Sequence, residues 1–193
     1  MIFKMVDLYK KVLVRQNDKT YQEQGTRKEE PGRLWKESMT INPQKDEYGS
    51  GKAEIADFAI LDKEGNYTNI VEKGKEFTIR MRAKFYQRLD YPIIAFAIKD
   101  IHGTTITGTN TMYENINTGC PEAGESFILE FRQQMDLQGG EYLLSLGCTG
   151  YENGELTVYH RLYDVCSITV VADKVADGFF DMNSKVELRY CRD

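Results

Sequence analysis

A strict two-residue alternation between residues 77 and 86 constrains the fold more than any other feature of the chain. Apolar side chains occupy every second position, at Phe77, Ile79, Met81, Ala83 and Phe85. Polar or amphipathic side chains fill the positions between them, at Thr78, Arg80, Arg82, Lys84 and Tyr86. Successive side chains of a β-strand point to opposite faces of its sheet. The pattern therefore predicts a strand with one buried face and one solvated face.

Several more segments have the length and composition of strands and are separated by turn residues. The nearly continuous apolar run at residues 92–98 is typical of a central strand, and glycines punctuate the intervals that follow. Further strands are expected at residues 106–113, 127–135, 141–148, 156–163 and 165–171. Short strands at regular spacing with no helix between them predict an all-β, antiparallel two-sheet β-sandwich, immunoglobulin-like or jelly-roll-like, over residues 49–173.

The segments on either side of this span have a different character. Residues 1–48 predict a short N-terminal helix at 2–14, followed by an irregular linker of mixed charge in which Trp35 is expected to pack on a neighbouring surface. Residues 174–193 contain Phe179, Phe180 and a further alternating apolar run. This pattern predicts a C-terminal strand segment that is free to pair with another copy of the chain, since a second copy can cover an apolar edge.

Composition limits the classes of function. A length of 193 residues suits one domain with a full core, and a net charge of −5 argues against a nucleic-acid-binding protein. The four cysteines form no CxxC pair and only two histidines are present, which disfavours a zinc site and favours free thiols in a reducing cytoplasm. Charged residues interrupt the N-terminal apolar positions, so we expect no signal peptide and no transmembrane helix.

Motifs that would indicate an enzyme or a cofactor are incomplete. Gly51-Lys52 lacks both the earlier glycine and the following hydroxyl of a phosphate-binding loop. The acidic turn around Gly65 lacks the glycine and glutamate positions of a calcium-binding EF-hand. No nucleophile elbow accompanies the histidines. We therefore expect neither a cofactor nor catalysis. A jelly-roll carbohydrate enzyme remains an alternative, because two of the 30 acidic residues would suffice for glycoside hydrolysis.

An ordered series of segments carries a family resemblance. It begins with GSGKAEIADFAILDKEG (49–65) and FTIRMRAKF (77–85), and continues with YPIIAFAIKDIHGTTITGTNT (91–111). It ends with YHRLYD (159–164), the strand at 166–171 and GFFD (178–181). Over residues 49–185 this series resembles the C-terminal module of the ATP-binding subunits of Wzt-type ABC transporters, which export O-antigen and related bacterial polysaccharides.

The resemblance implies a function and a set of partners. Such a module is expected to recognise the non-reducing end of a cell-surface polysaccharide, so that completion of the chain is coupled to its export. It implies a homodimer with an exchanged terminal strand, and attachment to the membrane subunit through an ATPase domain. The phrase VDLYKK (6–11) resembles the end of that ATPase domain, so we expect Met1 to follow a cut. The expected location is peripheral, at the cytoplasmic face of the cell membrane. The alternative is a dimerisation or docking module without affinity for glycan.

The polar faces of the predicted strands supply the candidate glycan site. Aromatic rings offer apolar faces to a sugar ring, and guanidinium groups offer forked donors to hydroxyl or phosphate groups. The alternative is that these side chains form only the solvated face of a sheet. For Asn110, hydrogen bonding to the ligand and satisfaction of a strand end are both open. The predicted ligand-binding residues are Arg80, Arg82, Tyr86, Lys99, Asn110, Tyr159, His160, Arg161 and Tyr163.

Overall fold

A computed structural model describes residues 33–174, 176–182 and 184–191 of the chain. The helix predicted at residues 2–14 lies outside the described residues. Within them the chain forms one short 3-10 helix and nine strands. In order, these are η1 (Trp35–Ser38), β1 (Asp46–Tyr48), β2 (Ala53–Leu61), β3 (Ile70–Glu72), β4 (Glu76–Phe85), β5 (Ile93–Asp100), β6 (Thr105–Asn110), β7 (Ser126–Gln134), β8 (Gly140–Glu152) and β9 (Glu155–Val171).

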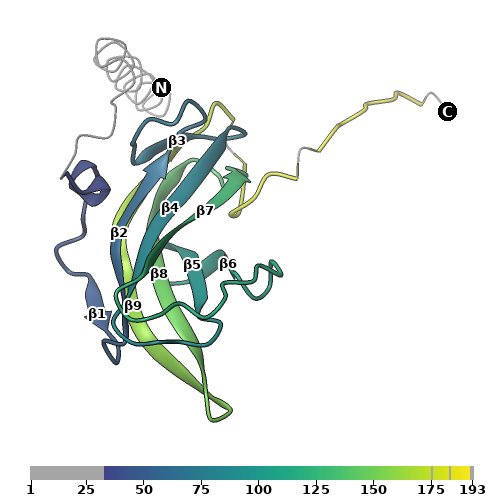
Figure 1. The fold of residues 1–193 in the computed structure, drawn as a ribbon. Coiled ribbons are helices and arrows are strands. Elements are labelled where there is room, and N and C mark those ends of the chain that lie inside the picture. The colour runs from purple at the N-terminus through teal and green to yellow at the C-terminus, as the bar shows by residue number, and fades with distance from the viewer. Residues whose placement is uncertain (1–32, 175, 183, 192–193) are drawn as a thin grey trace.

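The strands form the two packed sheets that the alternation predicted (Figure 1). One sheet has the order β2-β4-β7. The other has the order β1-β9-β8-β5-β6, and β3 pairs with β9 beside β1. All pairings are antiparallel except that of β3 with β9. The hairpin of β8 and β9 extends beyond the rest of the sandwich (Figure 1).

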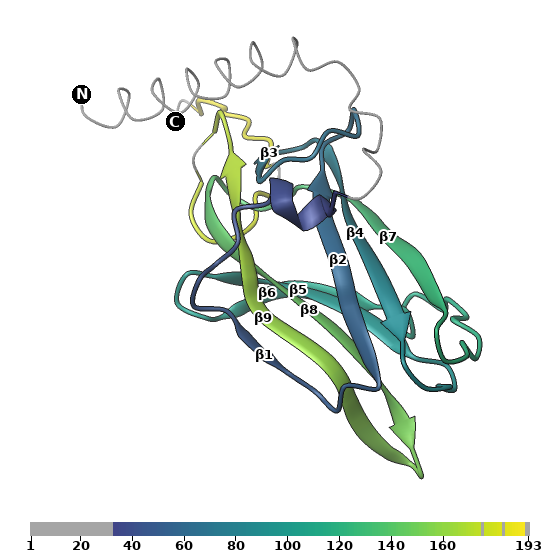
Figure 2. The same cartoon turned by 60° about the vertical axis from the view of Figure 1, so that its left-hand side comes forward.

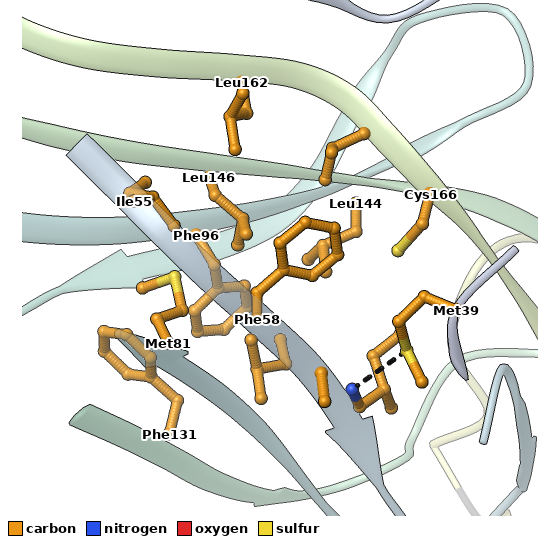
Figure 3. Close-up of a cluster of buried hydrophobic side chains, with 14 of the residues drawn as sticks. Met39, Ile55, Phe58, Met81, Phe96, Phe131, Leu144, Leu146, Leu162 and Cys166 are labelled. Carbon is orange, nitrogen blue, oxygen red and sulfur yellow. Dashed lines mark hydrogen bonds between the residues drawn. The ribbon is translucent and has the colours of Figure 1, made fainter. Parts of the chain in front are cut away.

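Apolar side chains from both sheets fill the space between them. In β4 the five predicted inward positions, Phe77 to Phe85, are all at most 2% exposed. Phe58 and Met81 of one sheet face Phe96, Leu144 and Leu146 of the other across the core (Figure 3). Complete burial of a side chain of this size stabilises the fold by about 1.5–3 kcal/mol. This layer therefore holds the two sheets together.

Residues 33–48, which the sequence predicted to be irregular, are attached to the sandwich. The Asp57 carboxylate, in the register shift of β2, accepts hydrogen bonds from the backbone N–H groups of Trp35 and Lys36, both at 3.0 Å. The Trp35 ring is buried, as expected, and lies 4.4 Å from the Arg82 guanidinium. Figure 2 shows η1 lying over β2, and β1 running beside β9. The segment thus contacts both sheets.

Four predicted strands differ in the structure. The strands expected at 156–163 and 165–171 are one strand, β9, because a bulge at Asp164 bends the strand without ending it. The strand expected at 106–113 ends at Asn110, since residues 111–115 form a turn. In the described part of the C-terminal segment the only pairing is a bridge between Phe180 and Leu137, so the strand expected there does not form within one chain.

The Asp57 contacts lead to a prediction about the attachment of η1. Replacing Asp57 with alanine should destabilise the fold by about 1.5–3 kcal/mol, the usual range for a hydrogen bond to a charged group. Because Trp35 is the only tryptophan, its emission should shift to longer wavelength under conditions in which the sandwich stays folded. Urea unfolding and fluorescence measure the two effects. Asp136→Ala, at an exposed carboxylate, is the control. Unchanged emission in Asp57→Ala would show that another contact holds η1.

Candidate functional site

Small residues form the centre of the outer face of the six-stranded sheet. In β5, the side chains of Ile94, Phe96 and Ile98 enter the core, so those of Ala95 and Ala97 point outward. Register places Gly147 of β8 beside Ala95, and Ser145 beside Ala97. Gly108 of β6 lies beyond Ala97 in the same row. These five short side chains leave a low floor across three strands.

A cluster of aromatic and basic side chains lies along one side of this floor, with Tyr163 at its centre. The Tyr48 ring of β1 is 5.9 Å from the Tyr163 ring, between centroids. The Lys99 ammonium lies 4.5 Å from the Tyr163 centroid, and the Arg161 guanidinium carbon lies 5.6 Å from it. Hydrogen bonding with Tyr163 is the main cause that raises the pKa of the Tyr48 phenol, and the positive charge of Arg161 acts in the opposite direction. The two tyrosine rings, their hydroxyls and the two cations therefore lie together on the outer face of the sheet.

The positive charge of Lys99 is neutralised within the site. Its ammonium is 2.9 Å from Asp164 Oδ1, which also accepts a hydrogen bond of 3.0 Å from the Ser145 hydroxyl. Asp164 has a φ of +51°, and its carbonyl accepts a hydrogen bond from the Asn42 side chain. A non-glycine residue takes this conformation only when its surroundings determine it. This network fixes the Lys99 ammonium above the Tyr163 ring.

Arg161 has no such carboxylate partner. Its guanidinium lies across Gly147, where an added Cβ would come within 3.0 Å of it. Arg161 Nε is buried and forms no hydrogen bond with any described residue, and the described residues hold no ion pair to this side chain. Most buried polar atoms do form a hydrogen bond. Arg161 therefore retains both a positive charge and donor capacity on this face.

Three of the predicted site residues belong to the other sheet, so the prediction of one surface that includes them is wrong. Arg80 and Arg82 project from β4, and Tyr86 follows it, in the β2-β4-β7 sheet. Arg80 is paired with Glu130 at 2.7 Å, and both arginines lie against Trp35. The Tyr86 hydroxyl donates to Glu54. Alternation within one strand cannot reveal which sheet that strand will join, which is why the sequence grouped these residues with β9.

Two more predicted residues are buried. Tyr159 is 1% exposed because a register shift beside it breaks the alternation with Arg161. Its hydroxyl lies 2.7 Å from where a Cβ on Gly150 would be. His160 is 8% exposed: its Nδ1 accepts from the Ile55 N–H at 2.9 Å, and its Nε2 is 3.1 Å from a Glu47 carboxylate oxygen. Both residues hold the strands in place and neither is on the outer face.

Asn110 lies on the same face as Arg161, at the far end of one row. Register links Tyr48, Arg161, Gly147, Ala95 and Asn110 across five strands. Asn110 Oδ1 accepts from the Tyr113 N–H at 2.8 Å and so closes the turn after β6. Of the two roles that the sequence left open for Asn110, the turn is therefore present in the structure.

The sequence prediction missed Tyr48 and the floor. Ala95 and Ala97, together with Ser145 and Gly147, are small residues at every second position of apolar strands, and this pattern would have indicated a low outer face. Tyr48 carries no such signal, because a three-residue strand after a linker shows no period.

In the described part of the chain, no group of three or more histidine, cysteine or acidic side chains is arranged to hold a metal ion. Nor do these residues include a helix that is long and apolar enough to span a membrane.

Comparison with known proteins relates this fold to one family. The sequence model described as the Wzt C-terminal domain matches residues 44–182. A crystal structure of the C-terminal domain of Wzt superimposes with a TM-score of 0.73 at 22% identity, covering 80% of this chain and 95% of that one. At this identity the superposition shows a shared fold. No sequence among curated proteins matches the chain.

Two other solved structures are much less similar. A CARDB domain from Pyrococcus furiosus, solved with two metal ions, has a TM-score of 0.35 at 14% identity and covers 61% of this chain and 90% of that one. A β-glucosidase from Listeria innocua, solved with gluconolactone, has a TM-score of 0.34 at 11% identity and covers 64% of this chain and 17% of that one. Superpositions this poor carry no argument about function.

The family match spans well over half of the 193 residues and includes every strand of both sheets. The chain belongs to the Wzt C-terminal domain family, which is associated with polysaccharide export by ABC transporters.

Proposed function

We propose that the outer face of the six-stranded sheet binds the non-reducing end of a cell-surface polysaccharide of the O-antigen type. The observation that carries the proposal is the cluster around Tyr163, in which two tyrosine rings and two cations lie beside a floor of small residues. Ligand sites combine apolar and aromatic surface with a few placed polar groups. This face has that composition.

Each part of the cluster has a chemical role toward a sugar. The rings of Tyr48 and Tyr163 offer apolar faces to the C–H side of a pyranose, and their hydroxyls offer hydrogen bonds to its edge. Arg161 offers forked donors to a pair of hydroxyls or to an anionic substituent. Because Asp164 already neutralises Lys99, Arg161 is the cation on this face with an unpaired charge.

The C-terminal segment supports a second element of the proposal, a homodimer. Residues 176–182 are attached to the sandwich through Asp181, which lies 3.1 Å from Lys73 and 2.8 Å from Lys174. Beyond them the chain runs away from the sandwich (Figure 1), and Val186 and Leu188 are 90% and 75% exposed. Apolar side chains this exposed are typical of a surface that a partner covers. A second copy of the chain is the partner that we propose, and two linked glycan sites would gain avidity.

The proposal also has a cellular setting. The domain would lie at the cytoplasmic face of the membrane, next to the ATPase and membrane subunits of an exporter, and would admit only finished chains. Without glycan affinity, the same fold and the exposed C-terminal segment would suit a dimerisation or docking module, and this is the second candidate function.

Calorimetric titration of the full chain separates the two functions. The titrant is the purified cell-surface polysaccharide of the source organism, either intact or after removal of its terminal residue. The proposal expects saturable binding of the intact polymer and a loss of at least tenfold in affinity for the trimmed one. Absence of binding to both polymers would favour the docking module. Equal binding to both would place recognition along the chain and not at its end.

Arg161 should contribute directly to this binding. Loss of a hydrogen bond to a charged group costs about 1.5–3 kcal/mol, so Arg161→Ala should weaken binding roughly ten- to hundredfold. Because Arg161 has no carboxylate partner, the melting temperature should change little. Tyr163→Ala should also weaken binding, without a change of charge. Arg132→Ala is the matched control, since Arg132 is an exposed arginine on the other sheet. Unchanged affinity in both site variants would rule out this face.

Dimerisation should depend on the end of the chain. A chain that stops at Met182 keeps the contacts of Asp181 and Phe180 but loses the exposed side chains of Val186 and Leu188. Light scattering should report a dimer for the full chain and a monomer for the shortened one. A dimer for both chains would show that this segment is not part of the interface. A monomer for both chains would contradict the proposed dimer.

A further inference from the structure

Strand β1 is a short strap that is tied at both ends. On the N-terminal side, the backbone N–H of Asn42 donates to the Val165 carbonyl at 2.9 Å. On the C-terminal side, the N–H of Ser50 donates to the Val158 carbonyl at 3.0 Å. Gly49 fits only because it has no side chain, since a Cβ there would lie 2.3 Å from the Tyr159 carbonyl oxygen. Between these ties, all three residues of β1 are exposed.

The middle of the strap has few contacts of its own. Asp46, Glu47 and Tyr48 pair with only one strand, β9, and form the edge of the sheet at this level. Exposed backbone hydrogen bonds at a sheet edge, with few buried contacts, open locally at a small fraction of the global unfolding free energy. The strap is therefore an element that can open while its two ties stay in place.

The side chains of Tyr48 and Glu47 on the strap contact different parts of the molecule. Tyr48 lies beside Tyr163 in the aromatic cluster of the outer face. Glu47 contacts His160, which is buried and in turn accepts from the Ile55 N–H of the opposite sheet. Because that N–H occupies His160 Nδ1, the neutral ring carries its proton on Nε2 and donates it to Glu47. Glu47 thus anchors the strap to the body of the sandwich, while Tyr48 is available to a ligand.

We infer that β1 is part of the glycan site, with Tyr48 as a binding residue, and that it closes on the ligand. This inference rests on the proposed function. A sugar ring that contacts both tyrosines favours the paired state of β1 over its open state. A ligand shifts a conformational equilibrium only by its difference in affinity for the two states, and Tyr48 supplies that difference. The tie at Asn42 confines the change to the strap, so η1 keeps its position.

Amide hydrogen exchange of the full chain, with and without the purified polysaccharide, tests the closure. At saturation, as defined by calorimetry, exchange of residues 46–48 should slow several-fold, while Trp35 emission and exchange of η1 stay constant. Absence of heat in the calorimeter would contradict the proposed function itself. Binding without slower exchange in β1 would overturn the closure of the strap and leave the proposed function standing. Slower exchange spread evenly over all strands would mean general stabilisation and would also overturn it.

Paired variants test the two side chains. Tyr48→Ala should weaken binding about three- to tenfold, the value of an aromatic contact. Tyr86→Ala, at an equally exposed tyrosine on the other sheet, should not. Glu47→Ala removes the acceptor of His160, so it should speed exchange of β1 in the free protein and weaken binding, because the competent state is less populated. Glu64→Ala, at an exposed carboxylate in the turn after β2, is the control. Unchanged affinity in Tyr48→Ala would show that β1 is not part of the site, and unchanged exchange in Glu47→Ala would show that Glu47 does not anchor the strap.

Discussion

The bulge at Asp164 in β9 determines both the core and the outer face of the larger sheet. Between the pairs Leu144–Cys166 and Leu146–Leu162, three residues of β9 stand opposite Ser145 alone. The excess is two residues, an even number, so Leu162 and Cys166 both still face the core. The additional length bends the strand and directs the Asp164 carboxylate to Ser145 and Lys99 on the outer face. An excess of one residue would have moved the core-facing side chains of one half of β9 to the outer face of the sheet.

From this bulge the two sides of the sandwich acquire different chemistry. On the larger sheet, Arg161 and Tyr163 remain outside, beside a floor of small residues, and the Asp164 carboxylate between them and Lys99 is paired with Lys99. On the smaller sheet, Arg80 forms an ion pair with Glu130, and the guanidinium groups of Arg80 and Arg82 both lie against the Trp35 ring of η1. The two faces differ in what surrounds their arginines: Trp35 lies against Arg82 of the smaller sheet, whereas Arg161 of the larger sheet lies beside the floor of small residues.

Local pattern was enough to predict the fold class and most of the strands. The alternation in β4 and the apolar run of β5 reflect burial on one face or on both faces, and burial is what forms a sandwich. Sheet membership was not predictable in the same way, because it depends on pairing between distant strands, and Arg82 and Arg161 were therefore grouped together. Tyr159 was misplaced for a related reason: a register shift leaves no mark in the sequence. Tyr48 was missed because its strand has only three residues.

The central claim is that glycan binds the outer face of the six-stranded sheet. The most direct test is to follow backbone amide chemical shifts of the isotope-labelled protein during addition of the purified polysaccharide. The account predicts that the largest shift changes occur in β9, β8, β5 and β1, around Arg161, Gly147 and Tyr163, and that β4 and β7 remain unperturbed. Shift changes concentrated on β2, β4 and β7 would place the ligand on the opposite face and contradict the account.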